Sequence, residues 1–356
     1  MTLANRFVRS ATWEGMAADD GSMTPSLTKA MVDLAQGGVG LIISGHAYVL
    51  PEGQAGPWQM GMHKDELIDG HKKMTDAVHQ AGGRIVAQLA HSGHFAPKEL
   101  TQNTPRVVSD FEGLSKSPRH ELTQDDIKRL VDGFAQGARR AKAAGFDGVQ
   151  IHSAHGYLLS QFLSPAYNRR KDNYGGTIEN RTRVHLEILS AVRSLVGDDY
   201  PVLIKINSQD HIDHGLTLED SIAASKMLVQ AGLDAIELSG GTLTSGALSP
   251  SRTGITKEEK EAYFKNAALS YKKAMDVPLI LVGGMRSLTV AEETVKSKTA
   301  DYISMSRPFI REPGLVNRWK SGDTSPATCK SDNLCFGPAM EGKGIFCVVD
   351  QLKKNK

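Results

Sequence analysis

Two histidines and a tyrosine lie close together in the segment His152-Ser153-Ala154-His155-Gly156-Tyr157. Imidazole N–H groups can stabilise negative charge that develops on a carbonyl or nitro oxygen. A phenol can donate a proton to a developing carbanion. Zinc would require three or four ligands, and neither a His-Glu-x-x-His motif nor a cysteine pair completes such a set. We therefore predict catalytic roles for His152, His155 and Tyr157 and no metal; a structural histidine pair is the other interpretation.

Lys205 lies in an apolar segment, Val202–Ile206, that is predicted to be a buried strand. A charge in such a place must be paired or used. Lys205 suits an anionic group on a cofactor. A Schiff-base lysine, as in barrel aldolases, requires a depressed pKa, and the sequence does not decide between the two.

Two short segments late in the chain have the composition of a phosphate site. Gly283 and Gly284 follow one predicted strand, and Ser306 and Arg307 follow the next. The backbone N–H groups of Gly284 and Arg307 could hold a phosphate, with the Arg307 guanidinium adding charge. In the simpler interpretation, Gly283 and Gly284 only form a tight turn.

Apolar segments alternate with amphipathic ones along the chain, which predicts repeated βα units. The expected strands are Phe7–Ala11, Val39–Ile43, Arg84–Gln88, Gly148–Ile151, Val202–Ile206, Ala235–Leu238, Leu279–Val282 and Tyr302–Met305. The expected helices are Ser26–Gln36, Asp65–Ala81, Thr123–Ala144, Ile178–Val196, Leu218–Ala231, Lys257–Met275 and Leu288–Ser297. This pattern predicts the α/β class and a (β/α)₈ TIM barrel. A doubly wound sheet would be favoured by Gly-x-Gly-x-x-Gly after the first strand, which is absent.

Functional residues of TIM barrels lie at the carboxyl ends of the strands. Further candidates are Ala11 and Thr12 after the first strand, Gly45 and His46 after the second, and Gln88 at the end of the third. The segment His91–Glu121 is too long for a βα connection, so we expect an insertion over the mouth of the barrel.

The length and composition of the chain agree with one large domain. A chain of 356 residues, of which 40% are hydrophobic, is within the range of a single barrel with insertions. The net charge of +2 is spread along the chain and gives no case for nucleic acid or a membrane as partner. Met1–Arg9 lacks the apolar core of a secretory signal. We expect a cytoplasmic protein with a small-molecule substrate; a homo-oligomer is left open.

All three cysteines, Cys329, Cys335 and Cys347, lie near the C-terminus and do not form a disulfide framework. We expect a barrel domain over residues 1–323 and a C-terminal tail over 324–356.

Several motifs resemble those of the old yellow enzyme family of FMN-dependent ene-reductases, in a subgroup close to the barrel domain of trimethylamine dehydrogenase and enoate reductases. The resemblance runs from Asn5 to about Pro313, and its motifs are Asn5–Val8, Gln88–Gly93, Ile151–Leu158 and Phe162–Arg181.

This resemblance implies FMN as cofactor, NADH or NADPH as reductant, and reduction of an activated C=C bond. It implies that Gln88 and Lys205 contact the flavin pyrimidine edge and that Ala11, Thr12 and the Gly45–His46 backbone line the isoalloxazine. It further implies that Gly284, Ser306 and Arg307 hold the phosphate, that His152 and His155 bind the substrate oxygen, and that Tyr157 protonates Cα.

The chain departs from the family pattern at several places. Trp13 stands where the family usually has Thr or Cys, and Ser306 where many members have Gly. The family's segment before the first strand is mostly missing, which suggests a late start or a truncation. The spacing Cys329-x5-Cys335-x11-Cys347 resembles the iron–sulfur ligands of larger relatives, with Asp332 in place of one Cys. Because four thiolates are the norm, we interpret this as a degenerate cluster site; an Asp-ligated or three-iron centre is the alternative.

Three other functions remain open. Amine dehydrogenation usually needs an electron-relay cluster, against which Asp332 argues. A dihydrouridine synthase-like barrel would need a basic face or an RNA-binding extension, and a catalytic Cys in a barrel loop, where none of the three cysteines lies. A flavin-binding sensor would leave His152, His155 and Tyr157 without a use.

Overall fold

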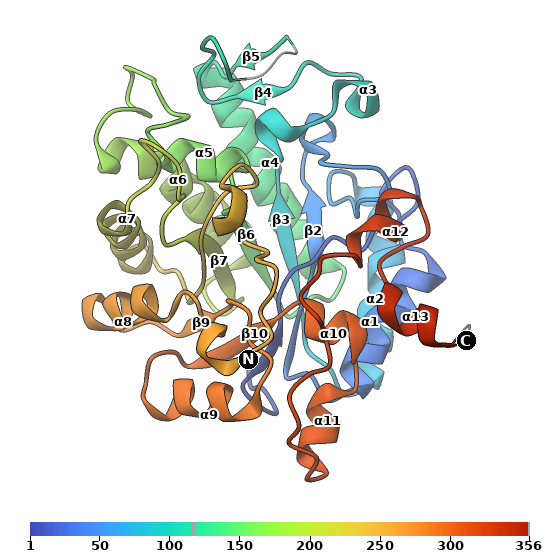
Figure 1. Ribbon diagram of the computed structural model, residues 1–356. Coiled ribbons are helices and arrows are strands. Elements are labelled where there is room, and N and C mark those ends of the chain that lie inside the picture. Colours follow the sequence, from blue (N-terminus) through green and yellow to red (C-terminus); the bar gives the residue numbers. More distant parts are fainter. Residues whose placement is uncertain (115–117, 355–356) are drawn as a thin grey trace.

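The computed structural model describes residues 1–114 and 118–354. Its centre is a closed barrel of parallel strands in the order β1-β10-β9-β8-β7-β6-β3-β2, which confirms the predicted TIM barrel (Figure 1). The strands are β1 (Phe7–Arg9), β2 (Leu41–Tyr48), β3 (Ile85–Ala90), β6 (Gly148–Ser153), β7 (Val202–Asn207), β8 (Ala235–Ser239), β9 (Leu279–Leu281) and β10 (Tyr302–Met305).

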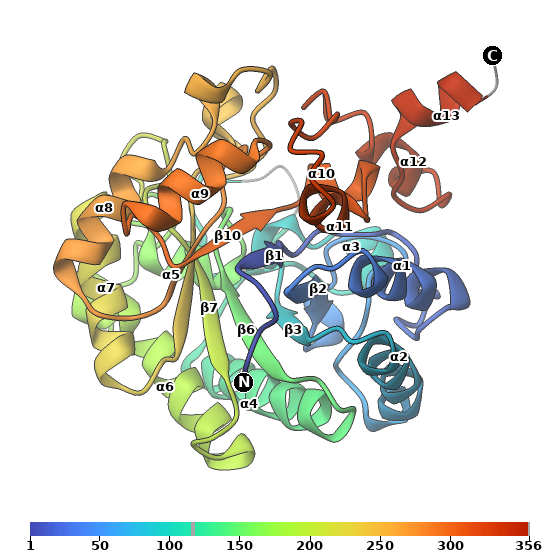
Figure 2. The ribbon, with the colours of Figure 1, turned by 90° about the horizontal axis from the view of Figure 1, so that it is seen from below.

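The major helices surround the barrel, because their apolar faces pack against the outward side chains of the strands (Figures 1 and 2). They are α1 (Pro25–Gln36), α2 (Ile68–Gln80), α4 (Gln124–Ala143), α6 (Ile178–Val196), α7 (Leu218–Gln230), α8 (Lys265–Ala274), α9 (Leu288–Lys296) and α10 (Arg307–Arg311). Helix α4 begins with a capping box, in which Thr123 and Asp126 satisfy each other's backbone N–H groups. Within the described residues, no helix has the length and apolar character needed to span a membrane.

The inside of the barrel is built in layers, since every second residue of a strand points inward. The first layer is apolar and contains Val8, Leu41, Ile43, Val86, Leu203 and Ile280. Two residues further along the strands the inward positions become polar: Ser10, Gln88, Gln150, Lys205, Glu237 and Ser304 are all buried. The next inward-facing positions, again two residues further along, border an open cleft; they are Thr12, His152, Ser239, Gly284 and Ser306. Because inward-facing residues recur at every second position, the inside of the barrel changes from apolar to polar toward the carboxyl ends of the strands, where the cleft lies.

The second strand is longer than predicted. Ser44–His46 does not follow the strand but lies within β2, which continues to Tyr48 after a register shift against β3 between Ile43 and His46. Gly45 is required there by packing, because a Cβ atom would lie 2.0 Å from Oε2 of Glu14. A glycine that suggested a strand end therefore accommodates a buried carboxylate.

The predicted helix Lys257–Met275 is also corrected, because α8 begins only at Lys265. The preceding segment folds over the end of β9 instead, where the Glu261 carboxylate accepts hydrogen bonds from the N–H groups of Arg286 and Ser287. Ala262 has a φ of 51°, which is incompatible with a continuous α-helix.

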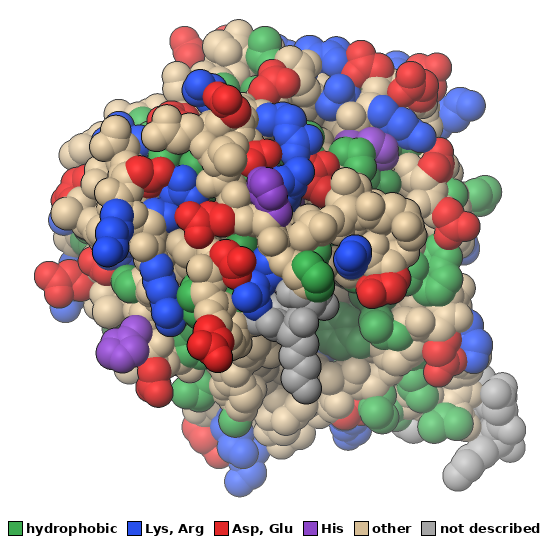
Figure 3. All heavy atoms as spheres, turned by 90° about the horizontal axis from the view of Figure 1, so that it is seen from above, with side chains coloured by type: hydrophobic (Ala, Val, Ile, Leu, Met, Phe, Trp, Pro, Cys, Tyr) green, Lys and Arg blue, Asp and Glu red, His purple; other side chains and the backbone are tan. Residues whose placement is uncertain are grey.

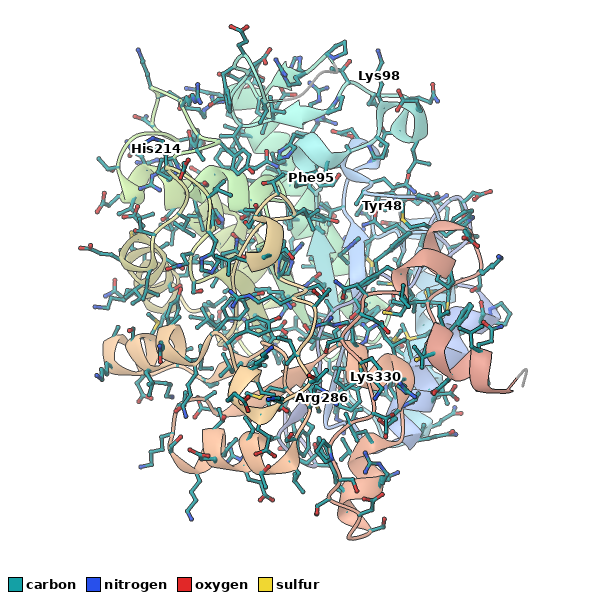
Figure 4. The ribbon with its side chains drawn as sticks, in the orientation of Figure 1. Tyr48, Phe95, Lys98, His214, Arg286 and Lys330 are labelled. Carbon is teal, nitrogen blue, oxygen red and sulfur yellow. The ribbon has the colours of Figure 1, made fainter. Side chains whose placement is uncertain are left out.

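The predicted insertion His91–Glu121 lies at one side of the barrel mouth, although its residues 115–117 are outside the described part. It contains α3 (Lys98–Thr101) and a small sheet of β4 (Arg106–Val107) and β5 (His120–Glu121) (Figure 1). Figure 4 labels Phe95 on this segment, and the Phe95 ring lies 6.1 Å from that of Tyr157. The insertion therefore covers one of the predicted catalytic residues. Over this side of the molecule, basic and acidic side chains are interspersed (Figure 3).

The C-terminal tail packs on the barrel and carries α12 (Phe336–Met340) and α13 (Val348–Lys354). Ala327 N–H donates to the carbonyl of Arg286, which is labelled in Figure 4. Ile345 N–H donates to the carbonyl of Glu14. These bonds attach the tail beside the loops that follow β1 and β9.

Candidate active site

A cleft that is open to solvent lies at the carboxyl ends of the strands. The structure brings together these predicted site residues along its wall: Ala11, Thr12, His46, His152, His155, Tyr157, Lys205, Gly284, Ser306 and Arg307. Gly45, Gln88 and Gly283 are not among the residues that line it.

The rings of His152, His155 and Tyr157 converge at one side of this cleft. Ring centroids are 5.3 Å apart for the two histidines and 4.9 Å apart for His152 and Tyr157. His155 adopts a left-handed φ of 64°, and its N–H donates to Oδ1 of Asn207 at 3.1 Å. Its Nε2 lies 2.8 Å from Oγ of Ser239. The turn after β6 is therefore held by β7 and β8, which fixes both imidazoles.

Both histidines are electrically neutral near pH 7. Burial and neighbouring groups, including Lys205, lower their pKa values well below the ordinary value. Nδ1 of His152 is buried without a hydrogen-bond partner among the described residues. A neutral imidazole that has no protein partner can offer its N–H to a ligand oxygen.

Tyr157 lies between these histidines and the insertion and is only 8% exposed. Burial raises the pKa of its phenol, so Tyr157 keeps its proton throughout the neutral range. Its Oη atom lies 3.3 Å from Nε2 of His46 on β2. A protonated phenol beside two neutral imidazoles can provide both oxyanion binding and a proton.

Lys205 belongs to a buried charge network on the floor of the cleft. Its Nζ lies 3.0 Å from Oε1 of Glu237 and donates to Oγ of Ser10 at 2.7 Å. Burial opposes ionisation of Glu237, but the neighbouring Lys205, Ser10 and Ser304 bring its pKa below the ordinary value. Lys205 is therefore engaged by a buried carboxylate and a hydroxyl group, whereas a Schiff-base lysine must be free to attack a carbonyl carbon.

Gln88 joins the same network from behind. Its Nε2 donates to Oε1 of Gln150 at 2.7 Å, and Gln150 in turn donates to Oε2 of Glu237 at 3.0 Å. In this structure the Gln88 amide thus contacts the network rather than the cleft.

The other side of the cleft carries the predicted phosphate residues. Gly283 and Gly284 have φ values of 140° and 73°, so the turn itself requires glycine there. Ser306 shares a hydrogen bond of 2.7 Å with Thr12. Arg307 is 8% exposed and donates to the amide oxygen of Asn333 at 2.7 Å. Among the described residues no carboxylate lies within ion-pair distance of Arg307, so its positive charge is not balanced by an ion pair.

Sequence reasoning missed several residues of the site. Glu237 could have been found, because a carboxylate in an apolar strand requires a partner and Glu237 is in register with Lys205. Ser10 and Gln150 follow from the same period of two. Tyr263, on the loop before α8, and Phe336, in the tail, also border the cleft. They come from the loop before α8 and from the short helix α12, and the sequence carries no local signal that places either at the cleft.

Trp13 borders the cleft as well. It packs against the tail cluster of Cys335, Ala339 and Ile345. The residue that departs from the family pattern therefore connects the tail to the cleft.

The three cysteines are free thiols, and they border one small cavity next to α10 together with Asp332. Burial, with neighbouring Cys329, raises the pKa of Cys335 to about 11, so this thiol is protonated. No group of three or more His, Cys, Asp or Glu side chains in the described part of the chain is arranged to hold a metal ion.

The fold and the cleft agree with the comparison to known proteins. Residues 1–325 match the model of the NADH:flavin oxidoreductase / NADH oxidase family. The chain therefore belongs to this family of FMN-binding oxidoreductases, which includes the old yellow enzymes.

Individual relatives fall into two groups by length. The NADPH dehydrogenase of Bacillus subtilis (strain 168) is 34% identical over 314 residues, which cover 88% of this chain and 89% of that protein. The NADH oxidase of Thermoanaerobacter brockii is 33% identical over 351 residues, which cover 95% of this chain but 52% of that protein. The chain thus spans about half the length of this second relative.

Solved structures show the same division. A 2-naphthoyl-CoA reductase in complex with 2-naphthoyl-CoA superposes with a TM-score of 0.90 at 28% identity, covering 98% of this chain and 55% of that one. The old yellow enzyme homologue from Zymomonas mobilis superposes with a TM-score of 0.76 at 28% identity, covering 92% of both chains.

Proposed function

We propose that this chain is an NAD(P)H-dependent FMN oxidoreductase that reduces an activated C=C bond, such as that of an α,β-unsaturated carbonyl compound. The observation that carries this proposal is the convergence of two neutral imidazoles and a protonated phenol at the side of one cleft. The reductases among its relatives support the reaction class. A small-molecule substrate and a cytoplasmic location belong to the same proposal.

The residues that border the cleft fit FMN. Arg307 offers a buried positive charge that no carboxylate of the described residues pairs, and Gly284 and Ser306 lie beside it, which matches the needs of a phosphate. Lys205 offers donors on the cleft floor, where its charge is balanced by Glu237. FMN bound there would supply the transfer of a hydride from NADH or NADPH to Cβ of the substrate.

The protein's own residues would complete the reaction. His152 and His155 would donate hydrogen bonds to the substrate oxygen on which negative charge collects. The Tyr157 O–H would give its proton to Cα, so that one hydride and one proton are added across the C=C bond. Phe95 and the insertion would cover Tyr157 and exclude water from the proton that is transferred.

The Tyr157→Phe variant tests this function. We expect reduction of the bound flavin by NADPH to be nearly unchanged, while the reoxidation by cyclohexenone slows roughly 100- to 10,000-fold, because a general acid is lost. Stopped-flow absorbance measures both half-reactions separately. Tyr167→Phe is the matched control, since it removes a hydroxyl that bonds Thr244. Equal losses in both half-reactions of Tyr157→Phe would contradict the proton-donor role.

A further inference from the structure

The side chain of His46 lies within hydrogen-bond distance of the Tyr157 hydroxyl. Nε2 of His46 lies 3.3 Å from Oη of Tyr157, and the two rings meet edge to face with centroids 5.4 Å apart. The His46 ring also lies parallel to that of His152, at 6.3 Å. In a pair of this kind, the direction of the hydrogen bond decides whether the phenol proton is free for a substrate.

Gln59 determines this direction, because its amide can have only one orientation. Its Oε1 accepts the N–H of Ala55 at 2.6 Å, and its Nε2 donates to the carbonyl of His46 at 3.0 Å. A backbone N–H can only donate and a backbone carbonyl can only accept. Rotating the amide by 180° would therefore place donor against donor and acceptor against acceptor. Gln59 is 1% exposed, so water does not take over these bonds.

The remaining N–H of the Gln59 amide points to Nδ1 of His46, at 2.7 Å. Nδ1 must therefore accept, which leaves the single proton of a neutral imidazole on Nε2. Burial lowers the pKa of His46 to about 4, so the ring is neutral near pH 7. His46 thus donates to Tyr157 through Nε2–H, and the phenol oxygen accepts.

We propose that His46 is a positioning residue for proton transfer: it donates to the Tyr157 oxygen, leaves the phenol proton directed at the substrate, and stabilises the phenolate that remains after transfer. This inference rests on the proposed function and adds to it a chain from Gln59 through His46 to the proton donor.

The proton balance of this step is simple. The Tyr157 O–H bond breaks, its proton forms the new C–H bond at Cα, and the electron pair stays on the phenolate oxygen. The hydrogen bond from His46 becomes stronger at that moment, because its acceptor is now charged. His46 keeps its own proton, since losing it would create an imidazolate, and the phenolate recovers a proton from water. The bond from His46 opposes the effect of burial, which makes the Tyr157 phenol a weaker acid.

The tautomer can be measured without any substrate. In protein labelled with ¹⁵N-histidine, we expect the His46 signals to show a protonated Nε2 and an unprotonated Nδ1 at neutral pH. The signals are assigned by their loss in His46→Phe. In Gln59→Leu, which removes the donor to Nδ1, we expect the tautomer population to shift toward Nδ1–H. A wild-type His46 with its proton on Nδ1, or with protons on both nitrogens, would overturn the proposal.

Kinetics test the same proposal through Tyr157. His46→Phe should slow the alkene-dependent half-reaction on the order of 10- to 100-fold, as expected for the loss of a hydrogen bond to a charged group, and should slow reduction by NADPH much less. His46→Gln, which restores a donor, should recover most of the rate. In the Tyr157→Phe background, His46→Phe should have no further effect. Equal slowing in both backgrounds would show that His46 does not act through Tyr157.

The two experiments separate this inference from the proposed function. If the wild-type protein reduces no activated alkene, the proposed function fails, while the NMR measurement still decides the direction of the hydrogen bond. If the alkene is reduced and His46 carries its proton on Nδ1, only the inference about His46 fails. Gln59→Leu and His46→Gln keep both measurements decisive if His46→Phe does not fold.

Discussion

Two cations, Lys205 and Arg307, border the same cleft, but their surroundings differ. Lys205 is 3% exposed and lies 3.0 Å from the carboxylate of Glu237. Arg307 is similarly buried, yet its partner is the neutral amide of Asn333, and among the described residues it has no carboxylate. The charge of Lys205 is therefore balanced by Glu237, whereas the charge of Arg307, at the start of α10, is not balanced by a carboxylate of the described residues.

This difference indicates where an anion can bind. A buried charge is unfavourable unless it is paired, so we propose that a negatively charged ligand group completes the Arg307 side. The Lys205 side, whose charge is already balanced, offers hydrogen bonds to an uncharged or weakly charged edge. A ligand with a phosphate at one end and a polar heterocycle at the other meets both requirements, as FMN does.

Removing the partner of Lys205 should have the largest effect. Glu237→Gln leaves a buried ammonium without its counter-charge, and we expect the free energy of unfolding to fall by roughly 3–5 kcal/mol. Urea unfolding measures the change. The matched control is Glu293→Gln at an exposed pair with Lys265, where we expect a change of at most about 1 kcal/mol. A loss as small as that of the control would mean that Glu237 does not compensate Lys205.

The next largest expected effect is on ligand affinity, which should differ between substitutions of Arg307 and of Lys205. Arg307→Met should weaken FMN binding roughly 10- to 100-fold, corresponding to a lost charge-assisted hydrogen bond of about 1.5–3 kcal/mol. Binding of riboflavin, which lacks the phosphate, should be nearly unchanged in Arg307→Met. Lys205→Met should weaken both ligands. Fluorescence titration of the apoprotein decides the matter, and an equal loss of riboflavin affinity in Arg307→Met would remove the assignment of the phosphate to this residue.

The smallest expected difference between the Lys205 side and the Arg307 side of the cleft is in how protein stability depends on pH. His152 is neutral in the folded protein because burial, His155, His46 and Lys205 lower its pKa, whereas the unfolded chain gains this proton near the ordinary value of 6.5. The contribution of His152 to stability is therefore complete above pH 6.5 and is lost as the pH falls below it.

Replacing His152 by Gln should reduce the slope of the unfolding free energy against pH by about 1.4 kcal/mol per pH unit below pH 6.5. Arg307→Met should leave this slope unchanged, since no group near Arg307 is expected to bind a proton in that range. Urea unfolding at several pH values gives both slopes. An unchanged slope in His152→Gln would show that this histidine is already protonated in the fold.

The sequence predicted the barrel because its strands alternate with amphipathic helices and its polar residues gather after the strands. It located His152, His155, Lys205 and Arg307 because a reactive side chain beside a buried strand is conspicuous. It misplaced the end of β2 at Ile43, whereas the strand continues to Tyr48 and Gly45 within it permits the close approach of Glu14.

The partnerships within the site could not be predicted in the same way. The contact of Gln59 with His46 and of Asn333 with Arg307 depends on how loops and tail fold back onto the barrel. Such contacts leave no periodic pattern, because each joins a strand or helix to a loop or tail segment outside the regular βα units. Lys205 and Glu237 are the exception, since strand register alone places them side by side.

The most direct test of the central claim is an anaerobic absorption measurement on the purified chain after it is supplied with FMN. We predict that the protein retains FMN, that its visible flavin absorption disappears on addition of NADPH, and that the absorption returns when cyclohexenone is added. A chain that retains no FMN would contradict the account of the cleft, and a flavin that is reduced but not reoxidised by any activated alkene would contradict the proposed reaction.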